Sequence, residues 1–291
     1  MIIVMQKYAS PQAVAEVVAF IRSRGLTEHV SEGEERTIIG AVGDERVFKP
    51  NELERLPQVE RAIRVLNDWR IISRETQAED SVIAVRGVAF GGGSVLDVTT
   101  DLQRSGQADA VFLDPFSVPD TPYADTARSN EKEQIAQMRD ALQHSHASDL
   151  PVLVRIRDVR QIAPALAHEA DILYLGGELM ANRMLQDEVG RLNTPLVLCK
   201  DKHHSYNEWL VAAERVALKG NRQIILGEAG TLSFAADHVH RLDVDAIARV
   251  KNLSHLPVLA NIAGLWHNDI SQQVLYRLAV AAGADAVVNS L

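Results

Sequence analysis

Eight short apolar runs constrain the fold more than any other feature of the chain. They are expected to form strands at 95–98, 110–113, 152–156, 172–175, 196–199, 224–226, 258–260 and 286–288. Continuous apolar runs are typical of parallel strands buried on both faces, and six of the runs are joined by segments long enough for a helix. This alternation predicts an α/β fold with a TIM (β/α)8 barrel over residues 94–291. A doubly wound sheet is the alternative, but no Gly-x-Gly-x-x-Gly follows the first strand.

Two parts of this barrel are shorter than a complete barrel needs. Residues 99–109 separate the first two strands and are too few for a helical crossover, and the chain stops at Leu291, directly after the eighth strand. We therefore expect a barrel without helices 1 and 8, which would be neighbours around the closed ring. Because large exposed apolar faces mark interfaces, we expect the face of strands one and eight to be covered by a homo-oligomer contact, by another protein or by the small domain.

Residues 1–67 follow a different pattern. Strand-like runs lie at 2–5, 26–30 and 37–42, and Ser10-Pro11 predicts the start of a helix that ends near Gly25. A short helix at 51–56 and a last strand or helix at 59–66 complete the order β-α-β-β-α-β, which predicts a ferredoxin-like domain for regulation or docking. Residues 68–93 follow as a polar linker and a hairpin about Arg86-Gly87.

Charge and composition exclude several classes of partner. The formal net charge of −9 argues against nucleic acid, because neutralising a phosphate backbone needs a basic face. A single cysteine leaves no internal disulfide and suits a reducing cytoplasm. The amino-terminal MIIVMQKY is too short for a signal peptide, and no apolar run approaches membrane-spanning length. We expect a cytoplasmic protein with neither nucleic-acid nor membrane partners.

Polar residues gather where the predicted strands end, which is where parallel α/β folds build their sites. Residues 193–230 show this best: a strand is followed by a polar cluster, a helix capped by Ser205, and a second strand that ends in Gly-Glu-Ala-Gly. The catalytic candidates are Lys200, Glu228 and His203. The candidates for the lining of a small-molecule pocket are Asp114, Asp120, Arg155, Glu178, Cys199, Lys202, His204, Asn261, Trp266 and His267.

Two interpretations of these residues stay open. In the first the pocket is rebuilt, with Lys200 as a Schiff-base or anion-binding lysine, and with Glu228 and the histidines named above as metal ligands. In the second, solvated loop charges and internal ion pairs, such as Arg155 with Glu178, fill a site that has lost its function. Adjacent histidines point in different directions and no C-x-x-C or H-x-x-x-H spacing occurs, so we expect no metal.

For two of these residues, Cys199 and Trp266, we expect a structural role. Cys199 ends a buried strand without an evident partner base, so a small buried hydrophobe is a better description than a nucleophile. Trp266 lies just beyond the seventh strand, where it is expected to plug the mouth of the barrel.

Several blocks of sequence carry a resemblance to a known family. Early in the chain they are MIIVMQKYASPQAVAEVVAFIRSRGL, HVSEGEERTIIGAVGDERVF and LPQVERAIRVL, and later EADILYLGG, NEWLVAAE, LSHLPVLAN and LAVAAGADAVV. Over nearly the whole chain their order resembles 3-deoxy-D-arabino-heptulosonate-7-phosphate (DAHP) synthase of type I beta. The resemblance implies a barrel that condenses phosphoenolpyruvate with erythrose 4-phosphate, using a divalent metal, to open the shikimate pathway. It also implies a small domain that can bind an aromatic amino acid as a feedback inhibitor.

The positions that bind metal in that family hold other residues here. The resemblance places the family's Cys in the strand end 98–102 (VTTDL), which has none. Its Asp-Pro-Ser-His falls on 261–264 (NIAG), and its Glu falls near Ser290. Since a metal acts as a Lewis acid only where its ligands are in place, the resemblance implies no metal cofactor for this chain.

The positions that bind substrate differ as well. The Lys-Pro-Arg-Thr-Ser-Pro-Tyr loop becomes 117–123 (SVPDTPY), and the Gly-Ala-Arg-Asn-Met-Gln-Asn block becomes 177–182 (GELMAN), so that three cations are lost. Lys-Arg-Gly aligns with Cys199-Lys200-Asp201, and a phosphate-binding Arg falls at Ala229. Two phosphorylated anions need clustered Arg and Lys side chains. The sequence therefore predicts a DAHP synthase-like protein that has lost the condensation and acts as a pseudoenzyme or as a regulatory or binding protein. The alternatives are a repurposed carbon–carbon lyase or transferase of a specialised pathway and an atypical DAHP synthase.

Overall fold

The computed structural model describes residues 1–33, 36–42, 47, 49–63, 68–117, 131–234, 240–267 and 269–290. The chain divides into two compact units, Met1–Asp68 and Trp69–Leu291, which are described separately. Within the described ranges, no helix has the length and the apolar character that crossing a membrane requires.

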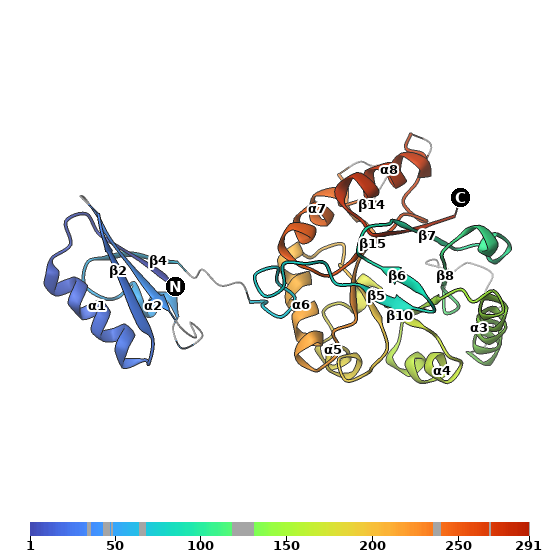
Figure 1. Ribbon diagram of the computed structural model, residues 1–291, viewed down its shortest axis with the longest axis horizontal. Coiled ribbons are helices and arrows are strands. Elements are labelled where there is room, and N and C mark those ends of the chain that lie inside the picture. Colours follow the sequence, from blue (N-terminus) through green and yellow to red (C-terminus); the bar gives the residue numbers. More distant parts are fainter. Residues whose placement is uncertain are drawn as a thin grey trace. The chain divides into compact units, whose positions relative to one another are not determined.

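The first unit is a four-stranded antiparallel sheet with two helices (Figure 1). Its elements are β1 (Ile2–Met5), α1 (Pro11–Ser23), β2 (Thr27–Glu32), β3 (Thr37–Val42), α2 (Pro50–Leu53) and β4 (Val59–Ile63), with the strand order β2-β3-β1-β4. Ser10 caps α1 by accepting a hydrogen bond from the Ala13 N–H, and Val17 and Ile21 of α1 pack in one buried cluster with Ile3. The predicted ferredoxin-like order of elements is confirmed.

The second unit contains a closed barrel of eight parallel strands. They are β7 (Leu96–Thr99), β8 (Ala110–Leu113), β9 (Val152–Ile156), β10 (Ile172–Leu175), β11 (Leu196–Cys199), β12 (Ile224–Glu228), β15 (Val258–Asn261) and β16 (Ala286–Asn289). The ring closes where β16 pairs with β7, with Ala286 opposite Leu96 and Val288 opposite Val98. All eight strands lie where the apolar runs predict them, so the predicted barrel is confirmed.

Helices surround the barrel on its outside (Figure 1). They are α3 (Glu131–His146), α4 (Ile162–Ala167), α5 (Arg183–Val189), α6 (Tyr206–Leu218), α7 (Val244–Leu253) and α8 (Gln272–Ala282), with short 3-10 helices η2 (Leu102–Gln107), η3 (Val159–Gln161) and η4 (Gly177–Leu179) and the ribbon β13 (Thr231–Leu232) and β14 (His240–Arg241). Trp209 of α6 is fully buried against the strands and donates its Nε1–H to the Leu198 carbonyl at 2.8 Å. This bond satisfies the polar atom of a large side chain that otherwise contributes apolar packing.

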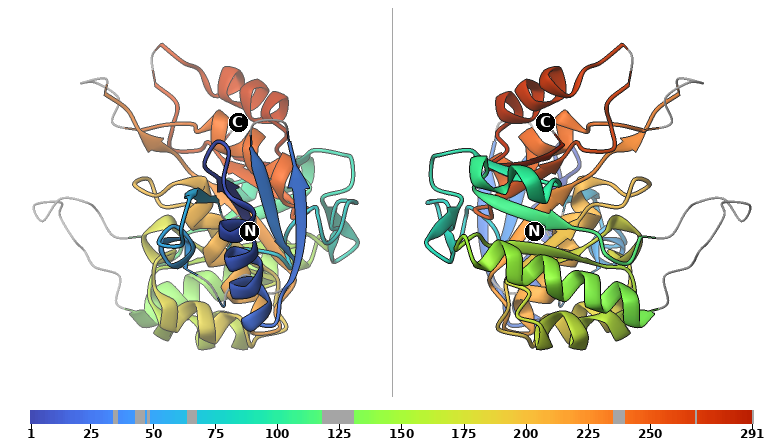
Figure 2. Two further views of the ribbon diagram at one scale, coloured as in Figure 1. Left: turned by 90° about the vertical axis from the view of Figure 1, so that its left-hand side faces the viewer. Right: turned by 90° about the vertical axis from the view of Figure 1, so that its right-hand side faces the viewer.

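One side of the ring has no full helix among the described residues. The connection between β7 and β8 forms only η2, as the short spacing predicts, and the described residues end at 290, just after β16. The right-hand view of Figure 2 faces this side, where η2 and α3 lie. Leu96 and Val98 belong to the cluster inside the barrel, so Asp97 and Thr99 face outward. The expectation of an apolar face is therefore wrong for β7, and a covering partner stays a prediction.

A hairpin closes the amino-terminal end of the barrel. Its strands β5 (Ile83–Val85) and β6 (Val88–Phe90) lie over the centre of the barrel in Figure 1. Ile83 and Phe90 pack in the same cluster as the inward-facing barrel residues. Between the strands, the Arg86 guanidinium lies 2.7 Å from the carboxylate of Asp171, which directly precedes β10. The hairpin predicted about Arg86-Gly87 thus forms the floor of the barrel, opposite the strand ends that could carry a site.

Gly227 gives a direct test of the packing inside the barrel. A Cβ at this position would meet Cys199 Sγ and would lie 2.7 Å from Val197 Cγ1. Because overpacking a closed core is costly, we expect Gly227→Ala to lower the free energy of unfolding by about 1–3 kcal/mol in urea denaturation. Gly264→Ala is the matched control, since no atom lies within 4 Å of a Cβ there. Equal effects of the two substitutions would contradict the packing account.

Candidate functional site

A cavity of about 330 Å³ opens at the carboxyl-terminal ends of the barrel strands. It is lined by Arg155, Tyr174, Gly176, Gly177, Glu178, Lys200, Asp201, Lys202, Ala229, His240, Asn261, Gly264 and Leu265. Five of the predicted site residues, Arg155, Glu178, Lys200, Lys202 and Asn261, are among them. The structure thus brings together strand ends that are far apart in the sequence, at the face where barrels of this type carry their sites.

The alternation of side chains along β11 decides which of its last residues faces the cavity. Cys199 belongs to the cluster inside the barrel and Leu198 to the cluster under the helices, so the next residue, Lys200, also faces the helices. Its Nζ lies 3.2 Å from Oδ2 of Asp243, the N-cap of α7, and its side chain is only 1% exposed. Lys200 is among the lining residues of the cavity, and its carbonyl lies close to Gly177, another lining residue.

Glu228 lies beside Lys200 and has the same orientation. The Lys200 N–H donates to the Gly227 carbonyl, so the ends of β11 and β12 are in register. Glu228 Oε1 accepts a hydrogen bond of 2.7 Å from the Gly230 N–H, and the backbone of Asp243 also stabilises the charged carboxylate. Burial raises the pKa of Glu228 to about 7, although the charge of Lys200 opposes this shift. The catalytic candidates Lys200 and Glu228 are therefore packed behind the strand wall.

Two arginines at the end of β9 do face the cavity side, and both are held by carboxylates. Arg155 Nη2 lies 2.9 Å from Glu178 Oε1, and its Nη1 lies 3.5 Å from Asp114 Oδ2. Arg157 Nε donates to Asp114 Oδ1 at 3.0 Å. The ion pair expected between Arg155 and Glu178 is present, whereas Arg157 was missed. The two-residue spacing of Arg155 and Arg157 on a strand is the signal that could have found it.

These ion pairs stabilise the charges of both partners. Burial works against the charged form of Arg155, but Glu178 and Asp114 outweigh it and the pKa of Arg155 is raised. Burial likewise opposes the charge of Glu178, but Arg155 outweighs it and the pKa of Glu178 is lowered. The arginines are thus neutralised by the protein itself, and Arg155 Nε is the one atom of its guanidinium that lacks a hydrogen-bond partner among the described residues.

The remaining cation of the cavity wall is Lys202. Its Nζ lies 3.4 Å from Nδ1 of His240, and burial together with the positive charges of Lys202 and His203 lowers the pKa of His240. The neutral imidazole of His240 therefore accepts a hydrogen bond from the ammonium group of Lys202. Asp201, next to Lys202 on the same wall, lies 3.3 Å from Nδ1 of His204.

The floor of the cavity carries polar groups but no charge. Asn261 Nδ2 donates to the Tyr174 hydroxyl at 3.1 Å, and the Tyr174 ring packs edge-on against Phe112 with centroids 4.8 Å apart. Burial raises the pKa of the Cys199 thiol to about 12 and raises the pKa of Tyr174 well above its usual value. Cys199 is consequently a protonated, packed side chain rather than a nucleophile.

Several predicted site residues do not line the cavity. Trp266 is 55% exposed, so the expectation that it plugs the mouth is wrong, and the neighbouring Leu265 lines the wall instead. His203 is exposed, and His267 Nδ1 lies 3.8 Å from Asp269 Oδ2, away from the lining. Asp120 lies outside the described residues.

Among the described residues, the side chains at these strand ends do not fit the divalent metal that the family of the resemblance uses. Across the described part of the chain, no three His, Cys, Asp or Glu side chains come together as a ligand set. At the positions matched to metal ligands after β15, Asn261 is uncharged and Gly264 has no side chain, and Ser290 follows β16.

Three comparisons relate this geometry to known proteins. Residues 1–67 match the model of the DAHP synthase ferredoxin-like domain, and residues 119–287 match that of the DAHP synthetase I family. A phospho-2-dehydro-3-deoxyheptonate aldolase of Thermotoga maritima is 28% identical over 302 residues, which cover 99% of this chain and 88% of that protein.

Solved structures give the same picture. The crystal structure of phospho-2-dehydro-3-deoxyheptonate aldolase (DAHP synthase) from Thermotoga maritima superposes with a TM-score of 0.78 at 25% identity, covering 100% of this chain and 87% of that chain. A truncated form of 3-deoxy-D-arabino-heptulosonate 7-phosphate synthase from Thermotoga maritima gives a TM-score of 0.66 at 21% identity. This match covers 77% of this chain and 85% of that chain. At that identity the second likeness concerns the fold alone.

Because the carboxyl group of Glu228 is buried, the free energy of unfolding should change with pH in a direction that can be stated. Its pKa rises from 4.5 to about 7, so the folded protein keeps this proton where the unfolded chain loses it. The free energy of unfolding should therefore fall by about 3 kcal/mol as the pH rises from the pKa of the unfolded chain to that of the folded protein. At higher pH, Glu228 should cause no further fall. Urea denaturation of the wild type and of Glu228→Gln at about pH 5 and about pH 8 isolates the effect. The same fall in both proteins would contradict the assignment.

Proposed function

The chain belongs to the DAHP synthetase I family, and from this premise we propose that it is a binding member of the family that does not condense phosphoenolpyruvate with erythrose 4-phosphate. In this proposal the ferredoxin-like domain and the barrel are kept as a frame, and the mouth of the barrel holds a small ligand of low net charge. The role is that of a regulatory or binding protein, a pseudoenzyme with respect to the family's reaction.

One observation carries the proposal: the arginines at the mouth are already paired. Arg155 and Arg157 are held by Asp114 and Glu178 at distances of 2.9 to 3.5 Å for the contacts given above. A phosphate monoester carries a charge of about −1.5 to −2 and is bound by Arg and Lys side chains that are free to donate to it. A phosphorylated substrate entering here would have to displace the carboxylates, and these would then repel it.

The chemistry of the other strand ends supports the same proposal. Joining two carbon skeletons by an aldol-type step needs a group that polarises the carbonyl. A metal held by its ligands polarises the carbonyl as a Lewis acid, without a proton transfer. Among the described residues no set of His, Cys, Asp or Glu side chains could hold a metal, and Ala229 lies in the wall of the cavity at the position where the resemblance places a phosphate-binding Arg. A repurposed lyase or transferase that uses Lys200 or Glu228 is disfavoured, because Lys200 pairs with Asp243 and Glu228 is fully buried.

Turnover tests the proposal directly. Phosphoenolpyruvate, erythrose 4-phosphate and Mn²⁺ are added to the full chain and phosphate release is followed. We expect no release above the rate without protein, because neither the cation cluster nor the metal ligands are in place. The Thermotoga maritima aldolase, assayed in parallel, is the positive control. Phosphate release at a rate near that of the control would overturn the proposal and would leave an atypical DAHP synthase.

A further inference from the structure

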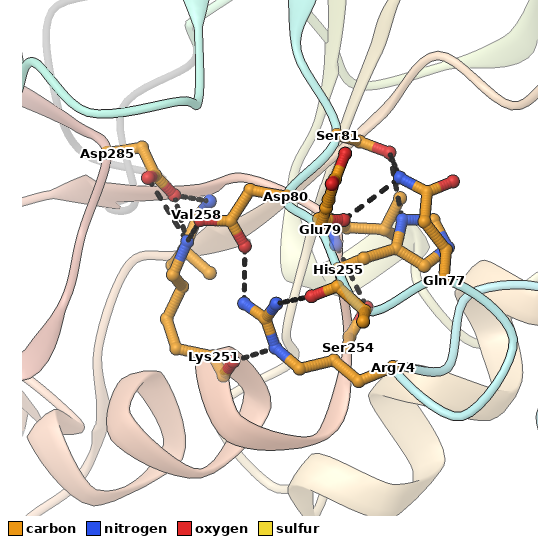
Figure 3. A network of polar contacts seen from close by, with 12 residues as sticks. Arg74, Gln77, Glu79, Asp80, Ser81, Lys251, Ser254, His255, Val258 and Asp285 are labelled. Carbon is orange, nitrogen blue, oxygen red and sulfur yellow. Dashed lines mark hydrogen bonds and ion pairs between the residues drawn. The ribbon is translucent and has the colours of Figure 1, made fainter.

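Lys202, in the wall of the mouth, has no carboxylate partner among the described residues. Cations elsewhere in the barrel unit do have such partners: Lys251 Nζ lies 3.0 Å from Asp285 Oδ2, and Arg74 pairs with Asp80 (Figure 3). The ammonium group of Lys202, by contrast, lies within ion-pair distance of no Asp or Glu in the part of the chain that the structure describes. Its side chain is partly buried, so the charge is shielded from water only in part and is available to a ligand in the cavity.

Two contacts with the ribbon of β13 and β14 fix the position of Lys202. Its carbonyl accepts a hydrogen bond of 3.3 Å from the Thr231 hydroxyl, and its Nζ lies 3.4 Å from Nδ1 of His240. Because Nδ1 of this neutral imidazole accepts from the ammonium group, Nε2 carries the hydrogen of the ring. Lys202 and His240 both line the cavity, whose wall therefore contains a charged and a neutral N–H donor. Donors that are already held in place bind a ligand without the entropic cost of ordering them.

Carboxylates of the protein lie on the neighbouring part of the same wall. Gly177 is packed against the loop that carries Lys202, since a Cβ on Gly177 would lie 2.7 Å from Asp201 Cα. The side chain of Glu178, which follows Gly177, is 47% exposed, and that of Asp201 is 23% exposed. Carboxylate oxygens accept hydrogen bonds from hydroxyl groups, and they repel a second anionic group on a ligand. This part of the wall thus favours a ligand with hydroxyl groups and a single negative charge.

The rest of the lining offers little apolar surface. Leu265 is 8% exposed and Tyr174 is 1% exposed, and Gly176, Gly177 and Gly264 have no side chains. A hydrocarbon body would therefore gain little from burial here, because that gain is proportional to the apolar area removed from water. A cavity of about 150 Å³ holds a benzene ring, so about 330 Å³ accommodates a body of about a dozen non-hydrogen atoms.

We propose that the mouth of the barrel binds a small hydroxylated monocarboxylate, whose carboxylate accepts hydrogen bonds from Lys202 and whose hydroxyl groups donate to the Glu178 and Asp201 carboxylates. This assignment, which rests on the proposed binding function, adds the chemical class of the ligand. A phosphorylated hydroxy acid is disfavoured, because its phosphate would bring a further charge of about −1.5 to −2 to the carboxylates of the wall. A fatty acid lacks the hydroxyl groups, and a neutral polyol lacks the group that Lys202 binds.

Calorimetric titration of the full chain with gluconate, sorbitol, hexanoate and 6-phosphogluconate tests the proposal. Gluconate combines a carboxylate with hydroxyl groups, whereas sorbitol lacks the carboxylate, hexanoate lacks the hydroxyl groups, and 6-phosphogluconate adds a phosphate. We expect gluconate to bind more tightly than each of the other three. Lys202→Gln should weaken gluconate binding by about tenfold, the loss of one charge-assisted hydrogen bond, and leave the binding of sorbitol unchanged.

The matched charge control is Lys219→Gln, because Lys219 pairs with Asp187 and does not line the cavity. This variant should bind gluconate as the wild type does, and circular dichroism checks that both variants fold. Absence of gluconate binding to the wild type would overturn the proposal. So would gluconate binding that Lys202→Gln leaves unchanged or that Lys219→Gln weakens equally, and so would hexanoate or 6-phosphogluconate binding as tight as that of gluconate. These results would leave the proposed function standing, since that function fails through phosphate release in the turnover assay.

Discussion

Closure of the eight-stranded parallel barrel is the constraint on which the rest of the structure depends. Once β16 pairs with β7, every strand residue must face either the barrel axis or the helices, and the two sets alternate along each strand. The inward set packs around residues such as Phe112 and Tyr174, and the outward set packs under α3 to α8. The same alternation assigns Arg155 to the cavity and Lys200 to the layer between strands and helices.

The mouth of the barrel follows from this assignment. Its inward cations meet inward carboxylates, so that Arg155 is shared between Asp114 and Glu178 and the charges are balanced within the protein. The outward pair, Lys200 and Glu228, supports the wall beneath α7 through Asp243. The frame of the DAHP synthetase I family is thus retained, while Arg155 and Arg157 at the end of β9 are paired with carboxylates of the protein itself.

The sequence predicted the scaffold well because its signals are local. Apolar runs place all eight strands, Ser10 and Ser205 cap the helices that they were expected to cap, and the spacing after β7 predicts the missing helix. The site was harder, because the direction of a side chain at a strand end depends on where the strand begins and on what lies across the barrel. Their places at strand ends indicate Lys200 and Glu228 as catalytic, but the alternation along the strands turns both toward the helices, and the same alternation places Arg157 beside Arg155. The exposure of Trp266 depends on the packing of the loop around it, which no short pattern in the sequence encodes.

The central claim is that the two arginines at the mouth, Arg155 and Arg157, are held by carboxylates of the protein and are not free to bind a phosphorylated anion. The most direct measurement is a calorimetric titration of phosphoenolpyruvate into the full chain in the presence of Mn²⁺. The account predicts no saturable binding up to millimolar concentrations, because Arg155 and Arg157 stay with Glu178 and Asp114. Saturable binding with a micromolar Kd would contradict it.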